Sequence, residues 1–286
     1  MAGAINCTDF TEDINSPEQY IRLAAEAGFT HMMWCHQWNT DFLYSKSEIA
    51  EIKKWFRQYN IALQDIHGSC GMEKSWFATE EYRRAAGVEL VLNRIQMLKE
   101  LDGTGVLIMH PPRINKEDSV EVINEKRARA ESLRRSLDEL MPALEKYDCC
   151  IALENLPRGT WEILTGLLDD YPAERIGFCF DSGHSNISVR PQFPEVEKYA
   201  DRIMAVHLHD NDGSSDQHLL PFAGTLDWQW VASVIKKSPY RRPLNFEVSF
   251  RKSSFFNPES ADTIPDQRKY LAEAMERGSR FARMCE

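Results

Sequence analysis

The feature that most constrains this chain is a regular alternation of short apolar runs with longer amphipathic stretches. The apolar runs begin roughly 34 residues apart on average, which matches βαβ units of 30 or more residues. Eight such runs are predicted to be strands: Ala4–Cys7, Thr30–Cys35, Ile61–Ile66, Gly105–Met109, Cys150–Leu153, Ile176–Phe180, Met204–Leu208 and Leu244–Val248. Strands that alternate with helices form a parallel sheet covered by helices.

The stretches between the runs carry helix signals. Pro17–Ala27, for example, follows the N-cap residue Ser16 and ends at Gly28. The other predicted helices span about 47–59, 79–101, 124–147, 160–169, 193–200, 227–236 and 264–284. Eight units favour an α/β fold closed into a single (β/α)8 TIM barrel over residues 1–286. An open doubly wound sheet is the alternative, but its nucleotide-binding form is disfavoured because no GxGxxG or GxxxxGK[ST] loop follows a strand.

Composition narrows the class of partner. The formal net charge of −10 disfavours non-specific binding to nucleic acid or to anionic membranes. The N-terminal segment lacks the basic start and apolar run of a secretory signal, and no run approaches a membrane span. Seven cysteines without a CxxC pair argue against a disulfide framework. We therefore expect a cytoplasmic protein with a small-molecule partner; a homo-oligomer stays an open expectation.

Histidines gather where the predicted strands end. In a TIM barrel, the C-terminal strand ends and the loops after them form the active site. Only His31 lies at a strand start. The other seven lie near the ends of strands or in the loops that follow: His36, His67, His110, His184, His207, His209 and His218. This distribution predicts a histidine-rich site at one end of the barrel.

Acidic side chains follow the same strands. Glu154, Asp181 and Glu247 each come directly after an apolar run or lie at its end, where an unpaired charge is costly. Together with His207 they end four successive strands, so they are predicted to converge and to share a divalent metal ion. This donor set suits manganese, zinc, cobalt or iron more than calcium. Magnesium also stays open, as does the number of ions.

Further residues are predicted to line the same pocket, either as additional metal ligands or as substrate contacts. These are His67, His110, His184, Asp216 and His218. His36 and His209 are weaker candidates, for which structural roles are as reasonable. Trp34, Trp38 and Trp76 are candidates for apolar pocket walls, with core packing as the alternative.

The segments ALENLP, FDSGH, VHLHDNDGSSDQHLLPFAGTLDW and FEVS together resemble the xylose isomerase-like TIM barrels, and the similarity runs along essentially the whole chain. That superfamily includes sugar and sugar-phosphate isomerases and epimerases, related dehydratases and endonuclease IV type enzymes. In the epimerase branch, the resemblance implies one metal on Glu154, Asp181, His207 and Glu247. It also implies that Glu154 and Glu247 act as acid and base. The ketose 3-epimerases carry an Arg in the loop where this chain has Gln217.

The endonuclease IV branch implies nine ligands for three zinc ions. All nine positions hold a suitable side chain here: His67, His110, Glu154, Asp181, His184, His207, Asp216, His218 and Glu247. However, the loop between His207 and Asp216 is shorter than in that branch. The loop after the second strand also has no arginine, although DNA binding takes several contacts from Lys or Arg to phosphates. Nucleic acid is therefore not the expected partner.

The chemistry that these expectations favour is proton transfer next to a carbonyl of a carbohydrate. A metal would act as a Lewis acid on the substrate, and one glutamate would remove a proton that the other returns. The alternatives are a dehydratase acting on a related polyol and an abasic-site nuclease. A phosphorylated substrate would need an anion site, for which Arg113 and Arg158 are candidates, although solvated loop charges are the simpler interpretation.

Overall fold

The computed structural model describes residues 3–6, 15–114, 118–187 and 192–286. It contains one eight-stranded parallel sheet in the order β7-β6-β5-β4-β3-β2-β1-β8. The strands are β1 Gly3–Asn6, β2 His31–Trp34, β3 Ala62–His67, β4 Leu107–Met109, β5 Ile151–Glu154, β6 Ile176–Asp181, β7 Ile203–His207 and β8 Leu244–Phe246. The prediction of eight parallel strands is confirmed, although Cys7, the expected end of the first strand, lies outside the described residues.

The two ends of the sheet approach each other just past β7 and β8. There, the Leu208 amide donates to the Asn245 carbonyl at 2.9 Å, and the Glu247 amide donates to the Leu208 carbonyl at 3.2 Å. These bonds make a short parallel bridge that brings the sheet close to a full ring. The fold is therefore a (β/α)8 barrel, and the open doubly wound sheet is excluded.

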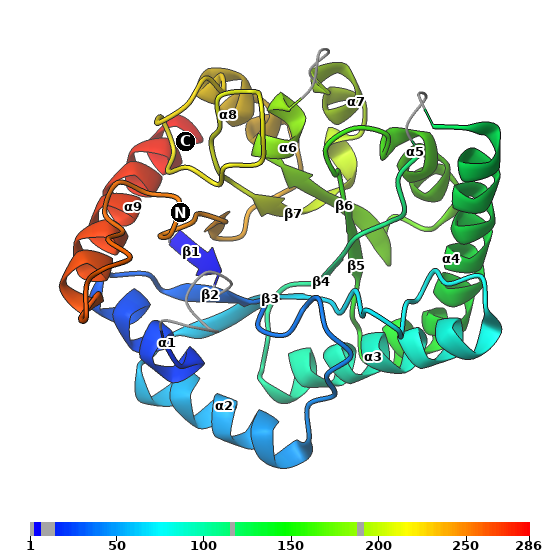
Figure 1. Cartoon of the computed structure of the whole chain (residues 1–286), viewed down its shortest axis with the longest axis horizontal. Helices are drawn as coiled ribbons and strands as arrows, with labels where there is room; N and C mark the ends of the chain where they lie inside the picture. Colours follow the sequence, from blue (N-terminus) through cyan, green and yellow to red (C-terminus); the bar gives the residue numbers. More distant parts are fainter. Residues whose placement is uncertain (1–2, 7–14, 115–117, 188–191) are drawn as a thin grey trace.

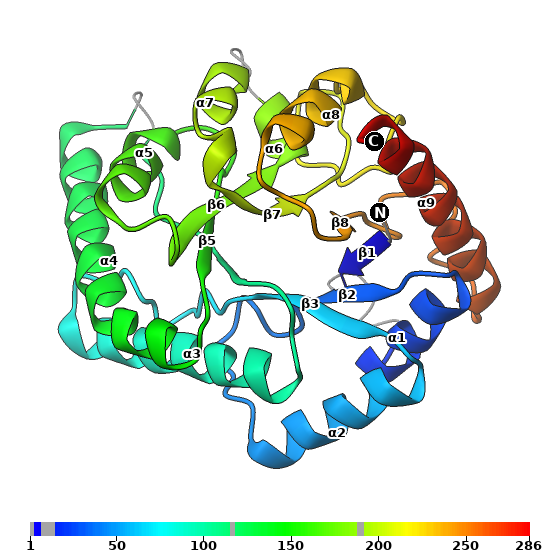
Figure 2. The same cartoon turned by 180° about the vertical axis from the view of Figure 1, so that it is seen from behind.

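The helices surround the strands, as Figures 1 and 2 show from opposite sides. They are α1 Pro17–Glu26, α2 Lys46–Gln58, α3 Glu81–Glu100, α4 Val120–Lys146, α5 Trp161–Asp170, α6 Ser182–Asn186, α7 Phe193–Lys198, the 3₁₀ turn η2 Ala200–Arg202, α8 Trp228–Lys237 and α9 Ile264–Met284. Among the helices that the structure describes, none has the length and apolar character that crossing a membrane requires.

Two helices depart from the sequence prediction. Helix α4 begins at Val120 rather than near residue 124, because the Ser119 side chain accepts a hydrogen bond from the Val122 amide and caps it. Helix α6 was not predicted. It is a single short turn directly after β6, and the Asp181 side chain caps it by accepting from the His184 amide at 2.6 Å. The last residue of a buried strand thus also fixes the start of this turn.

Arg94 of α3, a fully buried residue, anchors the loop between β2 and α2. Its guanidinium donates to the Phe42 carbonyl at 3.0 Å and lies 4.5 Å from the centre of the Tyr44 ring. Burial lowers the pKa of Arg94 to about 10, so the side chain stays charged at neutral pH. This buried cation holds the loop that carries Trp38, whose ring lies beside those of His67 and His110.

Candidate metal centre

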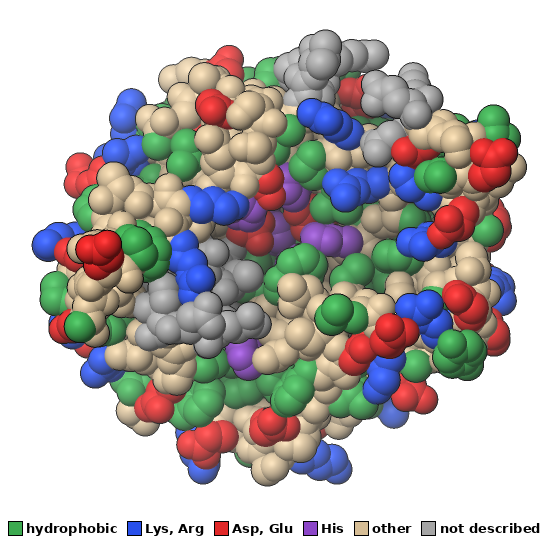
Figure 3. Space-filling view, in the orientation of Figure 1, with side chains coloured by type: hydrophobic (Ala, Val, Ile, Leu, Met, Phe, Trp, Pro, Cys, Tyr) green, Lys and Arg blue, Asp and Glu red, His purple; other side chains and the backbone are tan. Residues whose placement is uncertain are grey.

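Four predicted donors meet at the C-terminal ends of β5 to β8. Glu154, Asp181 and His207 are the last residues of their strands, and Glu247 follows β8 by one residue. Each offers a ligand atom within 4.8 Å of those of the other three. Figure 3 shows the purple and red side chains of this region gathered in a hollow at the centre of one face. We call these four residues the central group.

The imidazole of His207 lies in the middle of the central group. Its Nδ1 is 2.9 Å from Glu247 Oε2, 3.4 Å from Glu154 Oε2 and 3.9 Å from Asp181 Oδ2. Nevertheless, within the described residues no acceptor is oriented for a hydrogen bond from this buried nitrogen. A ring nitrogen surrounded by carboxylate oxygens but not bonded to them is the arrangement expected around a cation. The donor set therefore fits a divalent metal ion.

The charges of the central group depend strongly on one another. Burial would raise the pKa of the Glu154 carboxyl, but His207 and His110 lower it well below its usual value. Likewise, His207 lowers the pKa of Glu247 to about 2 against the opposing effect of burial. Burial would lower the pKa of His207, but the two glutamates raise it well above its usual value. Without a metal, His207 therefore favours the ionised forms of Glu154 and Glu247, and the two glutamates favour a protonated His207. A metal ion bound at His207 would compete with that proton.

A second group consists of His67, His110 and Glu154. His67 Nε2 is 3.2 Å from His110 Nε2, which is 3.1 Å from Glu154 Oε2. The Nδ1 atom of His67 lies 3.1 Å from the Gly68 carbonyl, so a proton on Nδ1 leaves the Nε2 lone pair directed at its neighbours. Burial lowers the pKa of His67 to about 4, so it is neutral at pH 7, as a metal ligand must be.

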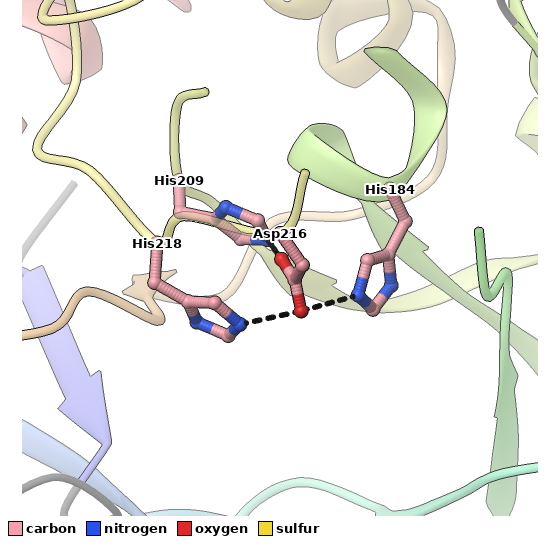
Figure 4. A group of neighbouring side chains, drawn as sticks. All are labelled: His184, His209, Asp216 and His218. Carbon is pink, nitrogen blue, oxygen red and sulfur yellow. Dashed lines mark hydrogen bonds and ion pairs between the residues drawn. The ribbon is translucent and has the colours of Figure 1, made fainter. Parts of the chain in front are cut away.

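A third group, which we call the outer group, consists of His184, His209, Asp216 and His218 (Figure 4). The Asp216 Oδ2 atom is 2.9 Å from His218 Nε2 and 3.3 Å from His184 Nε2. Its Oδ1 atom lies 3.7 Å from His209 Nε2 and is buried without a hydrogen-bond partner among the described residues. The rings of His209 and His218 stack with their centres 4.3 Å apart.

Backbone carbonyls favour one tautomer for two histidines of the outer group, His184 and His218. His184 Nδ1 lies 2.9 Å from the Asn155 carbonyl, and His218 Nδ1 lies 3.0 Å from the Glu247 carbonyl. When the single proton of each neutral ring sits on Nδ1, both Nε2 atoms are unprotonated, face Asp216 and are available as ligand atoms. Because Glu154 belongs to the first two groups and Asp181 contacts both His184 and His209, the three groups form one continuous cluster.

The structure thus brings together all nine residues that the sequence singled out, and it adds His209 together with Cys179, which forms a fourth group with Glu154 and His207. This histidine was expected to be a weak candidate, yet it is fully buried, with Nε2 3.1 Å from Asp181 Oδ1. Its separation of two residues from His207 was the usable signal, because alternate residues of a strand point to the same side. His36 lies outside the three groups, with Nδ1 2.9 Å from the Tyr44 hydroxyl.

Gly183 is required by the position of His209. A Cβ atom on Gly183 would lie 1.9 Å from Cε1 of the His209 ring, so a larger residue must displace the imidazole. We expect Gly183→Ala to lower the free energy of unfolding by about 1–3 kcal/mol, as overpacking of a tight site does. Urea denaturation of the native protein and the variant measures this difference.

The control for this change is Gly166→Ala in α5, whose added Cβ would meet only one side-chain nitrogen of Arg134, at 3.1 Å. That substitution is expected to be neutral or to stabilise by up to about 1 kcal/mol, because alanine is the better helix former. Equal effects of the two substitutions would show that His209 does not depend on Gly183.

Without metal, the outer group is expected to make stability depend on pH. Burial would lower the pKa of His218, but Asp216 raises it to about 9. Because this lies above the ordinary 6.5, the ion pair contributes fully below pH 6.5 and is lost as pH rises through 9. The free energy of unfolding of chelator-treated protein should therefore fall by up to about 3 kcal/mol between pH 6.5 and 10. Urea titrations at both pH values measure the drop, which His218→Gln should reduce; an equal drop in the variant contradicts the assignment.

Above the cluster lies a cavity of about 490 Å³. It is lined by Trp38, His67, His110, Arg113, Glu154, Leu156, Pro157, His184, Asp216, His218, Glu247, Val248 and Lys252. Trp38 forms an apolar wall, with its ring centre 4.6 Å from that of His67 and 5.1 Å from that of His110. Trp34 and Trp76 are instead buried in the core, so the alternative of core packing holds for these two.

The two predicted anion-binding arginines differ. Both are exposed, but Arg113 lines the cavity, whereas Arg158, at a backbone φ of 58°, is not part of the lining. Lys252, after β8, lines the cavity and was not predicted from the sequence. The site therefore combines a polar, histidine-rich floor, apolar walls and two cations near the entrance.

The comparisons with known proteins agree with this architecture. The sequence model of a family described as xylose isomerase-like TIM barrel matches residues 21–276. The uncharacterized protein y4fM of Sinorhizobium fredii is 29% identical over 248 residues, which is 79% of this chain and 79% of that protein.

Two solved structures show the same fold. A D-tagatose 3-epimerase-like protein is 23% identical, with a TM-score of 0.72, and the match covers 98% of this chain and 99% of that chain. An IolI protein with a bound zinc atom is 15% identical, with a TM-score of 0.69 and coverage of 100% and 98%.

Proposed function

Because the chain belongs to the xylose isomerase-like TIM barrel family, we propose that it is a metal-dependent isomerase or epimerase of sugars or sugar phosphates. The observation that carries this proposal is the central group: two carboxylates, Glu154 and Glu247, flank His207 at the floor of a cavity large enough for a carbohydrate. The shared fold of an epimerase-like protein and of a zinc-binding IolI protein supports it.

The metal would be held by the central group, and it would supply Lewis-acid polarisation of a substrate carbonyl. Glu154 ends β5 and Glu247 follows β8, and these strands are not neighbours, so the two carboxylates reach the cavity from two sides. One carboxylate removes a proton from the carbon next to the carbonyl, and the other returns a proton. Return to the opposite face of the same carbon gives an epimer. Return to the former carbonyl carbon gives an isomer, with the proton of the adjacent hydroxyl passing to the former carbonyl oxygen.

Other residues shape the substrate's surroundings. Trp38, Leu156 and Val248 present apolar surface to the cavity and reduce the water around the reacting carbon. The Nε2 atoms of His67 and His110 face Glu154 on the cavity floor, where a substrate hydroxyl can reach them. These groups orient the substrate and hold protons at defined atoms, while the carboxylates carry out the transfers.

One observation favours a second candidate, an endonuclease IV-like abasic-site nuclease. The donor residues form four adjoining groups, which is enough for more than one ion. The formal net charge of −10 argues against a DNA substrate. The carbohydrate proposal therefore comes first.

Solvent exchange tests the proposed function. Metal-loaded protein is incubated in D₂O with a panel of ketoses and ketose phosphates, and NMR follows loss of the C–H signal next to the carbonyl. Exchange together with a new epimer or isomer supports the proposal, whereas exchange with loss of water points to a dehydratase. No exchange on any member, combined with cleavage of abasic DNA, would replace the proposal with the nuclease.

A further inference from the structure

Two cations line the cavity, and they come from loops on opposite sides of the barrel. Arg113 follows β4 and Lys252 follows β8, and these strands are diametrically placed in the ring of eight. Both side chains line the cavity whose floor holds Glu154 and Glu247. Figure 3 shows blue side chains around the central hollow, which itself is red and purple.

Each cation is tethered to a neighbouring loop through a backbone carbonyl. Arg113 donates to the Pro157 carbonyl at 3.2 Å, and the Lys252 ammonium donates to the Asp216 carbonyl at 2.7 Å. Neither forms an ion pair with a carboxylate in the part of the chain that the structure describes. Both therefore keep donors for a ligand, and neither charge has a direct carboxylate partner among the described residues.

A neutral sugar offers these cations little, since its hydroxyl groups bind equally well to neutral side chains. A guanidinium has five donors in a planar fork that matches the oxygens of a phosphate or a carboxylate. Two positive charges at a recessed entrance also raise the local concentration of anions. The entrance thus favours a substrate that carries negative charge at the end remote from the central group.

We propose that the substrate is an anionic sugar, a phosphate monoester or a sugar carboxylate, whose charged group binds Arg113. Lys252 supplies a second positive charge across the entrance. This inference rests on the proposed function and names its substrate class. It selects charged over neutral carbohydrates, and Lys252 takes the place of the sequence candidate Arg158.

Three ketoses that differ only at carbon six provide the test: D-fructose, D-fructose 6-phosphate and D-fructuronate. Calorimetry measures their binding to the metal-loaded protein. At least one charged ketose is expected to bind at least tenfold more tightly than fructose, and the stronger of the two identifies phosphate or carboxylate as the source of charge. Inorganic phosphate serves as a fourth probe that needs no sugar recognition.

Substitutions then locate the charge. Arg113→Gln is expected to weaken binding of the charged ketose and of inorganic phosphate by about 10–100-fold, the cost of charge-assisted hydrogen bonds. Lys252→Gln should weaken binding two- to fivefold, and more at low salt. Arg113→Lys keeps the positive charge but loses the planar set of guanidinium donors, so its affinity for the charged ketose should lie between those of the native protein and Arg113→Gln. Arg158→Gln is the matched control and should have no effect.

Two failures can be told apart in the same samples. If C–H exchange occurs but fructose binds as well as the charged ketoses, or if Arg113→Gln changes nothing, the anion site is wrong and the proposed function stands. If inorganic phosphate binds and Arg113→Gln abolishes that binding, but no ketose exchanges, the anion site stands and the isomerase or epimerase assignment fails. If neither a charged ketose nor inorganic phosphate binds to the native protein, the anion site is overturned.

Discussion

Glu154→Gln is expected to lower the rate of C–H exchange with solvent by at least about 1,000-fold, because it removes both a transferring carboxylate and a metal ligand. Glu154 is the residue that joins the central group to His67 and His110. Its Oε2 atom is 3.1 Å from His110 Nε2 and 3.4 Å from His207 Nδ1, and only 1% of the residue is exposed. A glutamine of the same size keeps the packing but loses the charge.

Glu247→Gln separates the two roles of a carboxylate. This substitution leaves three donors of the central group in place, so the metal should remain bound with reduced affinity while exchange is lost. The measurements are deuterium incorporation by NMR and metal content per chain. Glu162→Gln on α5 is the matched control, since Glu162 pairs with Arg127, 3.3 Å away, outside the site. Exchange within tenfold of the native rate in either active-site variant would remove the glutamates from the mechanism.

The barrel could be predicted because its pattern is local and repeated. Strands of a closed parallel barrel are covered on both sides, so each appears as a short continuous apolar run, and the helices between them carry their own caps. Residues such as Glu154, Asp181 and His207 were identified for the same reason. Parallel topology places every strand's C-terminal end at one edge, so strand-end polar residues must converge there without any knowledge of the loops.

The features that could not be predicted from the sequence depend on the backbone conformation of loops and on contacts between residues far apart in the chain. The position of Lys252 is set by its bond to the Asp216 carbonyl, a contact between two loops that no periodicity encodes. Arg113 and Arg158 were equal candidates for an anion site, and only the structure separates them: Arg113 lines the cavity, whereas Arg158 is a solvated loop charge at a positive φ. The contact of Gly183 with His209 depends on the unpredicted turn α6, and it becomes visible only in three dimensions.

Removing the metal is expected to abolish exchange and to reduce stability, with both effects reversed by adding the ion back. Three carboxylates of the cluster are largely or fully buried near one another, and a divalent cation offsets their repulsion. A ligand present at 100 times its dissociation constant stabilises the native state by about 2.7 kcal/mol. Chelator-treated and reloaded protein should therefore differ by about that amount in urea unfolding.

The variant that isolates the central group is His207→Gln, because His207 has no part in the outer group or in the second group. It should lose one equivalent of metal by elemental analysis, lose the stabilisation by added metal, and lose exchange. His31→Gln is its matched control, since His31 lies at the start of β2, at the opposite end of the barrel, and contacts Thr30. Unchanged unfolding and exchange after chelation would mean that the cluster works without metal. If His207→Gln still retains two equivalents, those ions belong to the second and outer groups, and abasic DNA becomes the next substrate to test.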